Sequence, residues 1–382
     1  MVKKLGKIDA LLMVIVVILV IFGIVMVFSA SYYSTINADV GPYHYLQRAI
    51  QWAIAGFAVM IGVSFVPYRV YYVLAPIAII AALVFLLLLY TPLGISINGA
   101  TRWLGIPNTE LTFMPGEFAK LAVILGCAWY YTRYANRTKH FVYGFLVVVI
   151  AAFVFFYLIY KQPNLSTAII VTVTVIVIMF LAGVPIGYVA GISVAGAVGV
   201  YYMIQTADDF HLNRISGFLD PFADAQGDFF QTVQGLLALG SGGLTGSGLG
   251  NSVQKALWLP FAQNDFIFAI IGEETGFIGC ILVLIAFLIL IWRCMMIAMR
   301  SKDRFAMLLG AGISVLFGLQ VILNIGVVTA VLPPTGVILP FISYGGNAII
   351  LFMFLMGIML NISRGDSKEL ASRRRRQREE AA

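Results

Sequence analysis

One carboxylate stands where a polar loop meets an apolar segment. Asp265 closes the sequence Gln263-Asn264-Asp265, and a long apolar run begins at the next residue. A carboxylate at such a border has water on one side and a medium of low dielectric on the other, so desolvation tends to raise its pKa. A raised pKa suits a general base. The alternative interpretation is a helix N-cap, for which Asp is well suited, and the residue types alone favour the cap.

A pair of opposite charges lies at the start of another apolar stretch. Glu117 and Lys120 are three residues apart, so they share one face of the helix predicted there. Burying such a pair in a membrane is costly unless the pair faces a wet cavity. The sequence supports two interpretations equally, a functional cavity and an ion pair that fixes helix packing.

Acidic residues elsewhere are weaker candidates. Asp220, Asp224 and Asp228 recur at intervals of four, as on one face of a helix. They are suited to a divalent cation, although a solvated acidic face is the simpler interpretation. Glu273 and Glu274 fall two turns into a predicted span, and ionisable groups at that depth are candidates for function or for capping and pairing with neighbouring helices.

The glycine-rich run GSGGLTGSGLG (240–250) invites comparison with phosphate-binding loops. It does not match the dinucleotide fingerprint, and no Lys in the chain precedes Ser or Thr as a P-loop requires. The run favours a tight loop between two interfacial helices. A backbone nest for a lipid pyrophosphate is the other interpretation.

Ten apolar segments must position these residues. The composition is 61% hydrophobic and 11% charged, which excludes a soluble globular, disordered or fibrous protein. The three cysteines form no CxxC pair and the three histidines are scattered, so neither a disulfide framework nor a metal cluster is indicated. Since a span needs about 20 apolar residues, ten are predicted, at about 9–31, 46–66, 70–91, 117–132, 141–160, 166–183, 186–204, 266–293, 305–331 and 345–363.

The distribution of charge orients this arrangement. With ten spans, 18 of the 24 Lys and Arg, but 6 of the 17 Asp and Glu, fall in pieces on the side of the termini. The positive-inside rule makes that side the cytoplasm. Nucleic-acid binding by the basic tail is disfavoured, because nothing foldable accompanies the tail. The sequence predicts an all-α polytopic membrane protein with one membrane domain (1–364), a large external loop (205–265) and a basic cytoplasmic tail (365–382).

Three external segments are predicted to be more than connectors: residues 92–116, the short joint Lys161–Asn164, which carries a charge next to a Pro, and the long loop 205–265. Residues 92–116 are rich in Pro, Gly and Asn and hold Arg102 and Trp103. In the long loop, Asp220-Pro221 is typical of an N-cap followed by Pro at the first helical position. We therefore expect an amphipathic helix from there to about Leu239, lying on the outer interface.

Seven motifs, in the same order, resemble those of one known family. Over about residues 8–364 the chain resembles the SEDS (shape, elongation, division and sporulation) proteins. The closing pieces PFISYGGN and LNISR are more similar to the division and sporulation branch than to the rod-elongation branch. The motifs are NGATRWL (98–104), MPGEFAKL (114–121), KQPNLST (161–167), GFLDPFADAQG (217–227), GSGGLTGSGLGNSVQK (240–255), LPFAQNDFIFAIIGEE (259–274) and PPTGVILPFISYGG (333–346).

The resemblance implies roles for particular residues. It assigns the catalytic carboxylate to Asp265, in the motif DFIFA. It also implies a central cavity, open to the outer leaflet, that binds substrate. The residues placed at this cavity are Arg102, Trp103, Glu117, Lys120, Gln263 and Ser343.

The sequence departs from the family pattern at several positions. The common QPDLGT is QPNLST here, so Asn164 and Ser166 replace Asp and Gly. Phe261 and Gln263 stand where Glu and His are frequent, and Gly116 stands where Ser is frequent. Asp265 is unaffected.

The resemblance implies an inverting peptidoglycan glycosyltransferase. Such an enzyme polymerises lipid II into β-1,4 glycan on the outer face of a bacterial plasma membrane, with undecaprenyl pyrophosphate as leaving group. The resemblance implies no definite cofactor, but a divalent cation (Mg²⁺ or Mn²⁺) is one candidate for offsetting the charge of the leaving pyrophosphate. The implied partners are a class B penicillin-binding protein and other membrane proteins of division or elongation complexes, at the septum. Two alternatives stay open, a lipid II flippase and a non-catalytic division scaffold.

Overall fold

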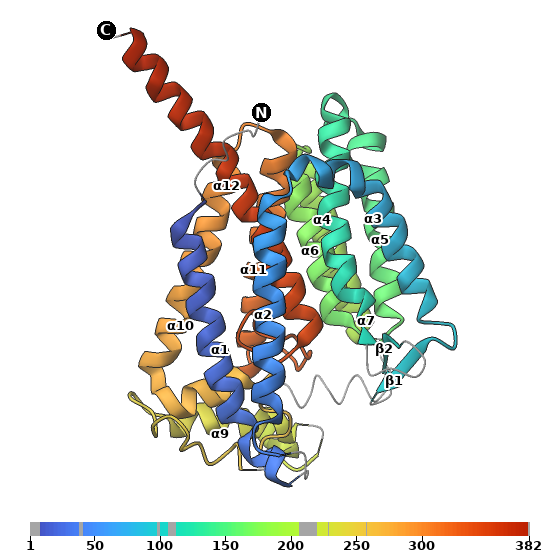
Figure 1. Cartoon of the computed structure of the whole chain (residues 1–382). Coiled ribbons are helices and arrows are strands. Elements are labelled where there is room, and N and C mark those ends of the chain that lie inside the picture. The colour runs from blue at the N-terminus through green and yellow to red at the C-terminus, as the bar shows by residue number, and fades with distance from the viewer. Residues whose placement is uncertain are drawn as a thin grey trace.

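Ten long helices occupy the ten predicted apolar segments within the part of the chain that the computed structural model describes, residues 8–37, 41–97, 100–105, 112–205, 220–227, 229–256 and 258–380 (Figure 1). Seven helices are long and apolar enough to cross a membrane, α5 being one of them only together with the π-helix Phe141–Leu146 that precedes it, and α6 and α7 are shorter apolar helices. The all-helical polytopic architecture is therefore confirmed. The helices are α1 (Ala10–Asn37), α2 (His44–Phe65), α3 (Tyr68–Leu88), α4 (Pro115–Arg133), α5 (Val147–Tyr160), α6 (Leu165–Leu181), α7 (Ile186–Gln205), α10 (Ile267–Arg300), α11 (Arg304–Val328) and α12 (Gly346–Glu380).

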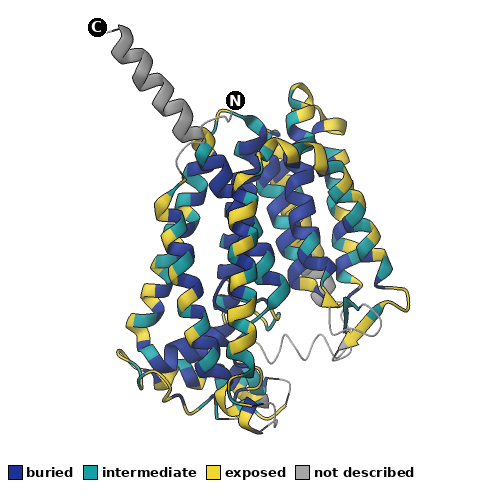
Figure 2. Ribbon diagram, in the orientation of Figure 1, coloured by how far each residue is buried: buried dark blue, intermediate teal, exposed yellow. Residues whose placement is uncertain are grey.

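The centre of the bundle is formed by α4, α11 and α12. α11 packs against α4, α6 and α10, and α12 packs along α2. Of the apolar stretch of each helix, 67% is buried in α11 and 72% in α12, against 22% in α3 (Figure 2). The outer helices expose apolar side chains such as Ile54, Val73 and Ile77. Apolar side chains outside and charged side chains inside are what a lipid solvent requires.

The start of α1 and the distant parts of α10 and α12 meet at one end of the bundle. Asp9 Oδ2 lies 2.6 Å from Arg293 Nη2, and the Asp9 N–H donates to Ser363 Oγ at 3.2 Å. The small sheet and the helix α9 (Phe230–Ser241) lie at the opposite end (Figure 1). The helical bundle thus begins and ends on the same side.

The segment 92–116 forms a small antiparallel sheet that the all-helical prediction did not include. β1 (Gly94–Ile97) pairs with β2 (Ala100–Gly105), and β2 pairs with β3 (Thr112–Phe113). The first two strands flank Asn98-Gly99, a dipeptide favoured in tight hairpins. The sheet lies directly before α4 and so fixes where the first turn of α4 begins.

The helix predicted from Asp220 to Leu239 is present as two pieces. A 3-10 turn covers Pro221–Asp224, and α9 follows after an interruption. Asp228 lies outside the described residues, so the expected acidic face of Asp220, Asp224 and Asp228 is not seen as a unit.

α10 is broken at Gly276, where φ is 68° and ψ is −170°. This left-handed backbone favours glycine, which has no Cβ to clash. An unbroken helix of 34 residues would be about 51 Å long, well beyond the ~30 Å hydrocarbon core. Glu273 and Glu274 therefore do not lie two turns into a continuous span, as expected, but at the end of a separate first part, 267–275.

Candidate active site

Asp265 lies in the turn immediately before α10. The helix begins at Ile267, its cap position is Phe266, and no side chain caps it. Within the described residues, the Asp265 carboxylate forms no hydrogen bond to the first N–H groups of α10. The capping interpretation of this residue was therefore wrong, because its carboxylate does not cap α10.

Two neighbouring segments hold this turn through its backbone. Asn324 of α11 donates from Nδ2 to the carbonyl oxygens of Asp265 and Val337, both at 2.7 Å. Tyr344 N–H donates to the Gln263 carbonyl at 2.9 Å. The carboxylate itself faces Gly336, because a Cβ built there would lie 3.8 Å from Asp265 Oδ2. The segment between α11 and α12 thus forms one wall beside Asp265.

Burial sets the acidity of this carboxylate. Desolvation disfavours its charged form and raises the pKa of Asp265 from 3.8 to about 6. At neutral pH the group is still mostly ionised, yet it binds a proton far more readily than an ordinary Asp. These are the properties of a general base.

Glu117 and Lys120 form the expected pair in the first two turns of α4. Lys120 Nζ lies 2.7 Å from Glu117 Oε1, and their side chains are 2% and 10% exposed, Lys120 being the more buried. The other carboxylate oxygen, Glu117 Oε2, has no hydrogen-bond partner among the described residues. The pair is thus buried with one acceptor unused.

Arg102 and Trp103 lie on β2, at the same end of the molecule as this pair. Arg102 donates to the Gln162 carbonyl at 3.4 Å and to the Pro163 carbonyl, so it fixes the joint between α5 and α6. Trp103 is half-buried opposite Ile95 of β1. A hollow of about 440 Å³ opens at this joint, and its lining includes neither Asp265 nor the Glu117–Lys120 pair. It is lined by Leu89, Tyr90, Thr91, Gly94, Thr101, Lys161, Gln162 and Pro163.

A chain of contacts joins the start of α4 to the wall beside Asp265. Asn164 caps α6 by accepting from Thr167 N–H at 3.3 Å. A Cβ at Gly116 would lie 3.6 Å from both side chains, so α4 and α6 begin side by side. Ser166 then donates from Oγ to the Thr335 carbonyl at 2.8 Å, one residue before Gly336. The described residues show no direct contact between the Asp265 carboxylate and the ion pair.

Gln263 and Ser343 form hydrogen bonds within the protein. Gln263 is 3% exposed, and its carbonyl accepts the bond from Tyr344 described above. Ser343 Oγ accepts from Leu339 N–H at 2.8 Å, and the residue borders a small cavity of about 20 Å³ between α1 and α2. Their contact with a substrate stays a prediction.

Comparison with known proteins decides the family. A family model described as cell cycle protein (FtsW/RodA/SpoVE) matches residues 9–368. The chain belongs to this family, the SEDS proteins. It is 35% identical over 356 residues to the probable peptidoglycan glycosyltransferase FtsW of Geobacter sp. (strain M18), covering 93% of this chain and 96% of that one. It is also 35% identical over 360 residues to stage V sporulation protein E of Bacillus subtilis (strain 168), covering 93% and 97%.

Two solved structures share the SEDS fold with this chain. One belongs to a peptidoglycan synthase complex that coordinates polymerization and crosslinking, with a TM-score of 0.78 and 25% identity over 94% of this chain and 98% of that chain. The other is the rod shape determining protein RodA of Thermus thermophilus, with a TM-score of 0.66 and 25% identity over 94% and 97%. The resemblance inferred from the motifs is confirmed over nearly the whole chain.

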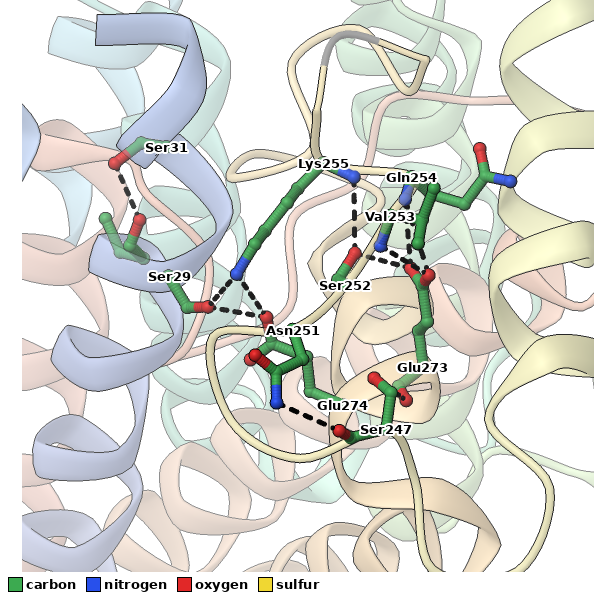
Figure 3. A network of polar contacts seen from close by, with 11 residues as sticks. Ser29, Ser31, Ser247, Asn251, Ser252, Val253, Gln254, Lys255, Glu273 and Glu274 are labelled. Carbon is green, nitrogen blue, oxygen red and sulfur yellow. Dashed lines mark hydrogen bonds and ion pairs between the residues drawn. The ribbon is translucent and has the colours of Figure 1, made fainter. Parts of the chain in front are cut away.

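Sequence reasoning named Glu273 and Glu274 as candidates for pairing but missed their partners, with which they form a buried polar network in this SEDS chain. Lys255 Nζ lies 2.6 Å from Glu274 Oε1 and donates to Ser29 Oγ at 2.9 Å (Figure 3). Beside it, Glu273 accepts from Ser252 Oγ and from Val253 N–H. One signal was available, because Lys255 is the only Lys in the predicted external loop.

The glycine-rich loop packs tightly on the end of the first part of α10. A Cβ at Gly242 would lie 2.0 Å from the Gly272 carbonyl oxygen, and one at Gly246 would lie 2.2 Å from the Glu274 carbonyl oxygen. The N–H groups of Ser247 and Gly248 donate to the carbonyls of Glu273 and Glu274. The glycines therefore permit close backbone approach, and these two N–H groups serve the protein instead of a pyrophosphate.

The described residues offer no ready site for a divalent cation. Within them, no three His, Cys, Asp or Glu side chains lie close enough to hold a metal ion. A role for Mg²⁺ or Mn²⁺ stays a prediction.

Proposed function

We propose that this chain is a peptidoglycan glycosyltransferase that polymerises lipid II into β-1,4 glycan strands. The observation that carries the proposal is Asp265, a half-buried carboxylate whose pKa is raised to about 6 and which caps no helix. The relatives named as probable peptidoglycan glycosyltransferases support the same reaction. They are also FtsW and sporulation proteins, which supports a role in division or sporulation.

The reaction assigned to this site is an inverting displacement. The Asp265 carboxylate takes the proton from the 4-hydroxyl of the acceptor GlcNAc as its oxygen bonds to C1 of the donor MurNAc. The bond from C1 to the α-linked pyrophosphate breaks at the same time, and undecaprenyl pyrophosphate leaves with both bonding electrons. Arg102 and Lys120 supply positive charge at this end of the molecule, where the leaving group gains negative charge. Glu117 orients Lys120.

We place this reaction on the outer face of the bacterial plasma membrane, with both termini in the cytoplasm. Single cysteines at Ser241 and Asn136, both exposed, should then differ in labelling by an impermeant thiol reagent on whole cells. The background would lack the buried native thiols Cys127, Cys280 and Cys294. Position 241 should label and position 136 should not. Labelling at 136 alone would mean that the topology is inverted and that Asp265 faces the cytoplasm.

We assign a class B penicillin-binding protein as partner, alongside other membrane proteins of the division complex at the septum. The support is the structural neighbour, which acts in a peptidoglycan synthase complex that couples polymerization to crosslinking. Helix association in the membrane, through small residues, would supply part of the contact.

A purified polymerisation assay tests the proposed function. The chain, with and without the class B partner, is incubated in detergent with lipid II, and glycan product is measured on gels. We expect polymer without any membrane asymmetry. Transbilayer movement of lipid II in sealed vesicles, with no polymer, would make the chain a flippase. Neither activity, with division defects that follow the partner interface, would make it a scaffold.

Polymerisation should fall as the pH decreases through about 6. The base acts as a carboxylate, and burial raises the pKa of Asp265 to about 6, so activity requires a pH above that value. Below it, the rate should drop about tenfold per pH unit, because the ionised fraction does. Initial rates between about pH 4.5 and 8 give the acid limb. A limb near the ordinary Asp value would contradict a buried base.

A further inference from the structure

The network around Lys255 is enclosed and charged. The Lys255 and Glu274 side chains are 2% and 0% exposed, and Ser29 of α1 donates to the same carboxylate oxygen, Glu274 Oε1, at 2.6 Å (Figure 3). A buried ion pair of this kind contributes little net stability compared with apolar packing. Its value lies in fixing one geometry, and here it joins Ser29 of α1 to Lys255 and Glu274, which lie 226 and 245 residues further along the chain.

The network lies beside the break in α10, where backbone hydrogen bonds join residues 243–248 of the glycine-rich loop to both parts of the helix. We call these bonds and the network together the clasp. On one side of Gly276, the loop N–H groups of Ser247 and Gly248 donate to the carbonyls of Glu273 and Glu274 at 2.9 and 3.0 Å. On the other side, Phe277 and Ile278 donate to the carbonyls of Gly243 and Leu244 at 2.9 and 3.1 Å. These bonds replace those that the helix loses at the break.

The clasp holds the piece of helix that carries Asp265 at its start. Residues 267–275 begin two residues after Asp265, and Ile267, Ile270 and Ile271 are fully buried. The Phe266 ring lies against α9, because a Cβ at Gly235 would meet its ring carbon at 2.8 Å. One end of this short rigid piece is therefore fixed by the clasp and the other presents the carboxylate.

We propose that Lys255 and Glu274 are positioning residues, which lock the 267–275 helix to α1 and the glycine-rich loop and so hold Asp265 at its working place. The inference rests on the proposed function, because it concerns the base of that reaction. Lys255 and Glu274 do not touch Asp265 and act through the helix. A misplacement of about 1 Å can cost about 100-fold in rate, so a loosened clasp should be felt in catalysis.

The test compares Lys255→Met, Glu274→Gln and the double variant in the purified polymerisation assay. Each single variant leaves one unpaired charge buried, so kcat should fall by up to about 100-fold. The double variant removes both charges and should lose less than the product of the single losses. Rates are divided by the number of molecules that bind lipid II, which removes any fraction that fails to fold. Lys139→Met, an exposed Lys at the other end of the bundle, is the matched control and should behave as wild type.

The pH profile supplies a readout that a purely stabilising network would not change. The two groups placed against Asp265 itself, the Asn324 amide and Gly336, carry no charge, and Tyr344 contacts the turn through its backbone N–H. Burial therefore dominates its acidity, and a loosened helix should hydrate Asp265 and move the acid limb below about 6. A Ser29→Ala variant removes only a hydroxyl and introduces no charge imbalance. It should lose about threefold in kcat and shift the limb in the same direction.

The outcomes test the positioning role and the proposed glycosyltransferase function independently. Wild-type kcat per binding-competent molecule and an unmoved acid limb in all three variants would overturn the positioning role, even if their yield of folded protein falls. If Asp265→Asn polymerises lipid II normally, the proposed function fails instead. An inactive Asp265→Asn with a shifted limb in Lys255→Met supports both.

Discussion

Asp265→Asn should make little or no glycan polymer from lipid II. Asn keeps the size and polarity of the side chain but accepts no proton, and general base catalysis contributes about 10²–10⁴-fold, or roughly 3–5 kcal/mol of barrier. The variant should reach the membrane in normal amounts and bind its partner. The backbone bond from Asn324 to residue 265 does not involve the substituted group and should persist. Polymerisation is measured on purified protein.

The matched control is Asp220→Asn, an exposed acid at the start of the 3-10 turn, which should retain full activity. A capping role for residue 265 makes the opposite forecast, because Asn caps about as well as Asp and only Ala would cost about 1 kcal/mol of stability. Near-normal polymerisation by Asp265→Asn would refute the catalytic assignment.

Glu117→Ala and Lys120→Ala should each damage the protein, and the double substitution should cost less than the two single costs added together. The two groups are 2.7 Å apart and buried, so removing one leaves a charge without its partner. Breaking such a pair typically costs about 3–5 kcal/mol. Removing both charges avoids that penalty, so the double variant should be milder than the sum. A double-mutant cycle, in both thermal stability and polymerisation rate, measures the coupling.

Lys139→Ala, on an exposed side chain, controls for the loss of a positive charge as such. Strict additivity in the cycle would mean that Glu117 and Lys120 do not interact. Coupling in stability without coupling in rate would reduce the pair to helix packing, the other interpretation that the sequence left open.

The helices could be located from the sequence because their signal is local. The apolar run predicted at 117–132 is α4 at Pro115–Arg133, and the charge pair follows from helical spacing alone. The break in α10 was hidden because the apolar run continues through Gly276, and glycine is tolerated within a helix pattern. The sheet at 92–116 was missed although Asn98-Gly99 is a hairpin signal.

The candidate site was likewise only partly predictable from the sequence. Asp265 was found because its chemistry is visible at one position. Its surroundings were not, because Asn324 is 59 residues away in the chain and Ser29 lies 226 residues from Lys255. Contacts at such separations depend on how the helices pack, and no spacing rule reports them.

The exchange of backbone bonds at Gly276 also constrains how this chain can be recombined with its relatives. The glycine-rich loop and the two parts of α10 satisfy one another's N–H and carbonyl groups, two on each side of the break. A chimera that takes the loop from one parent and the helix from another must match a fit in which Gly246 and Gly276 lie too close for any side chain. Residues 240–278 should therefore be transplanted as one cassette, with crossover points outside it.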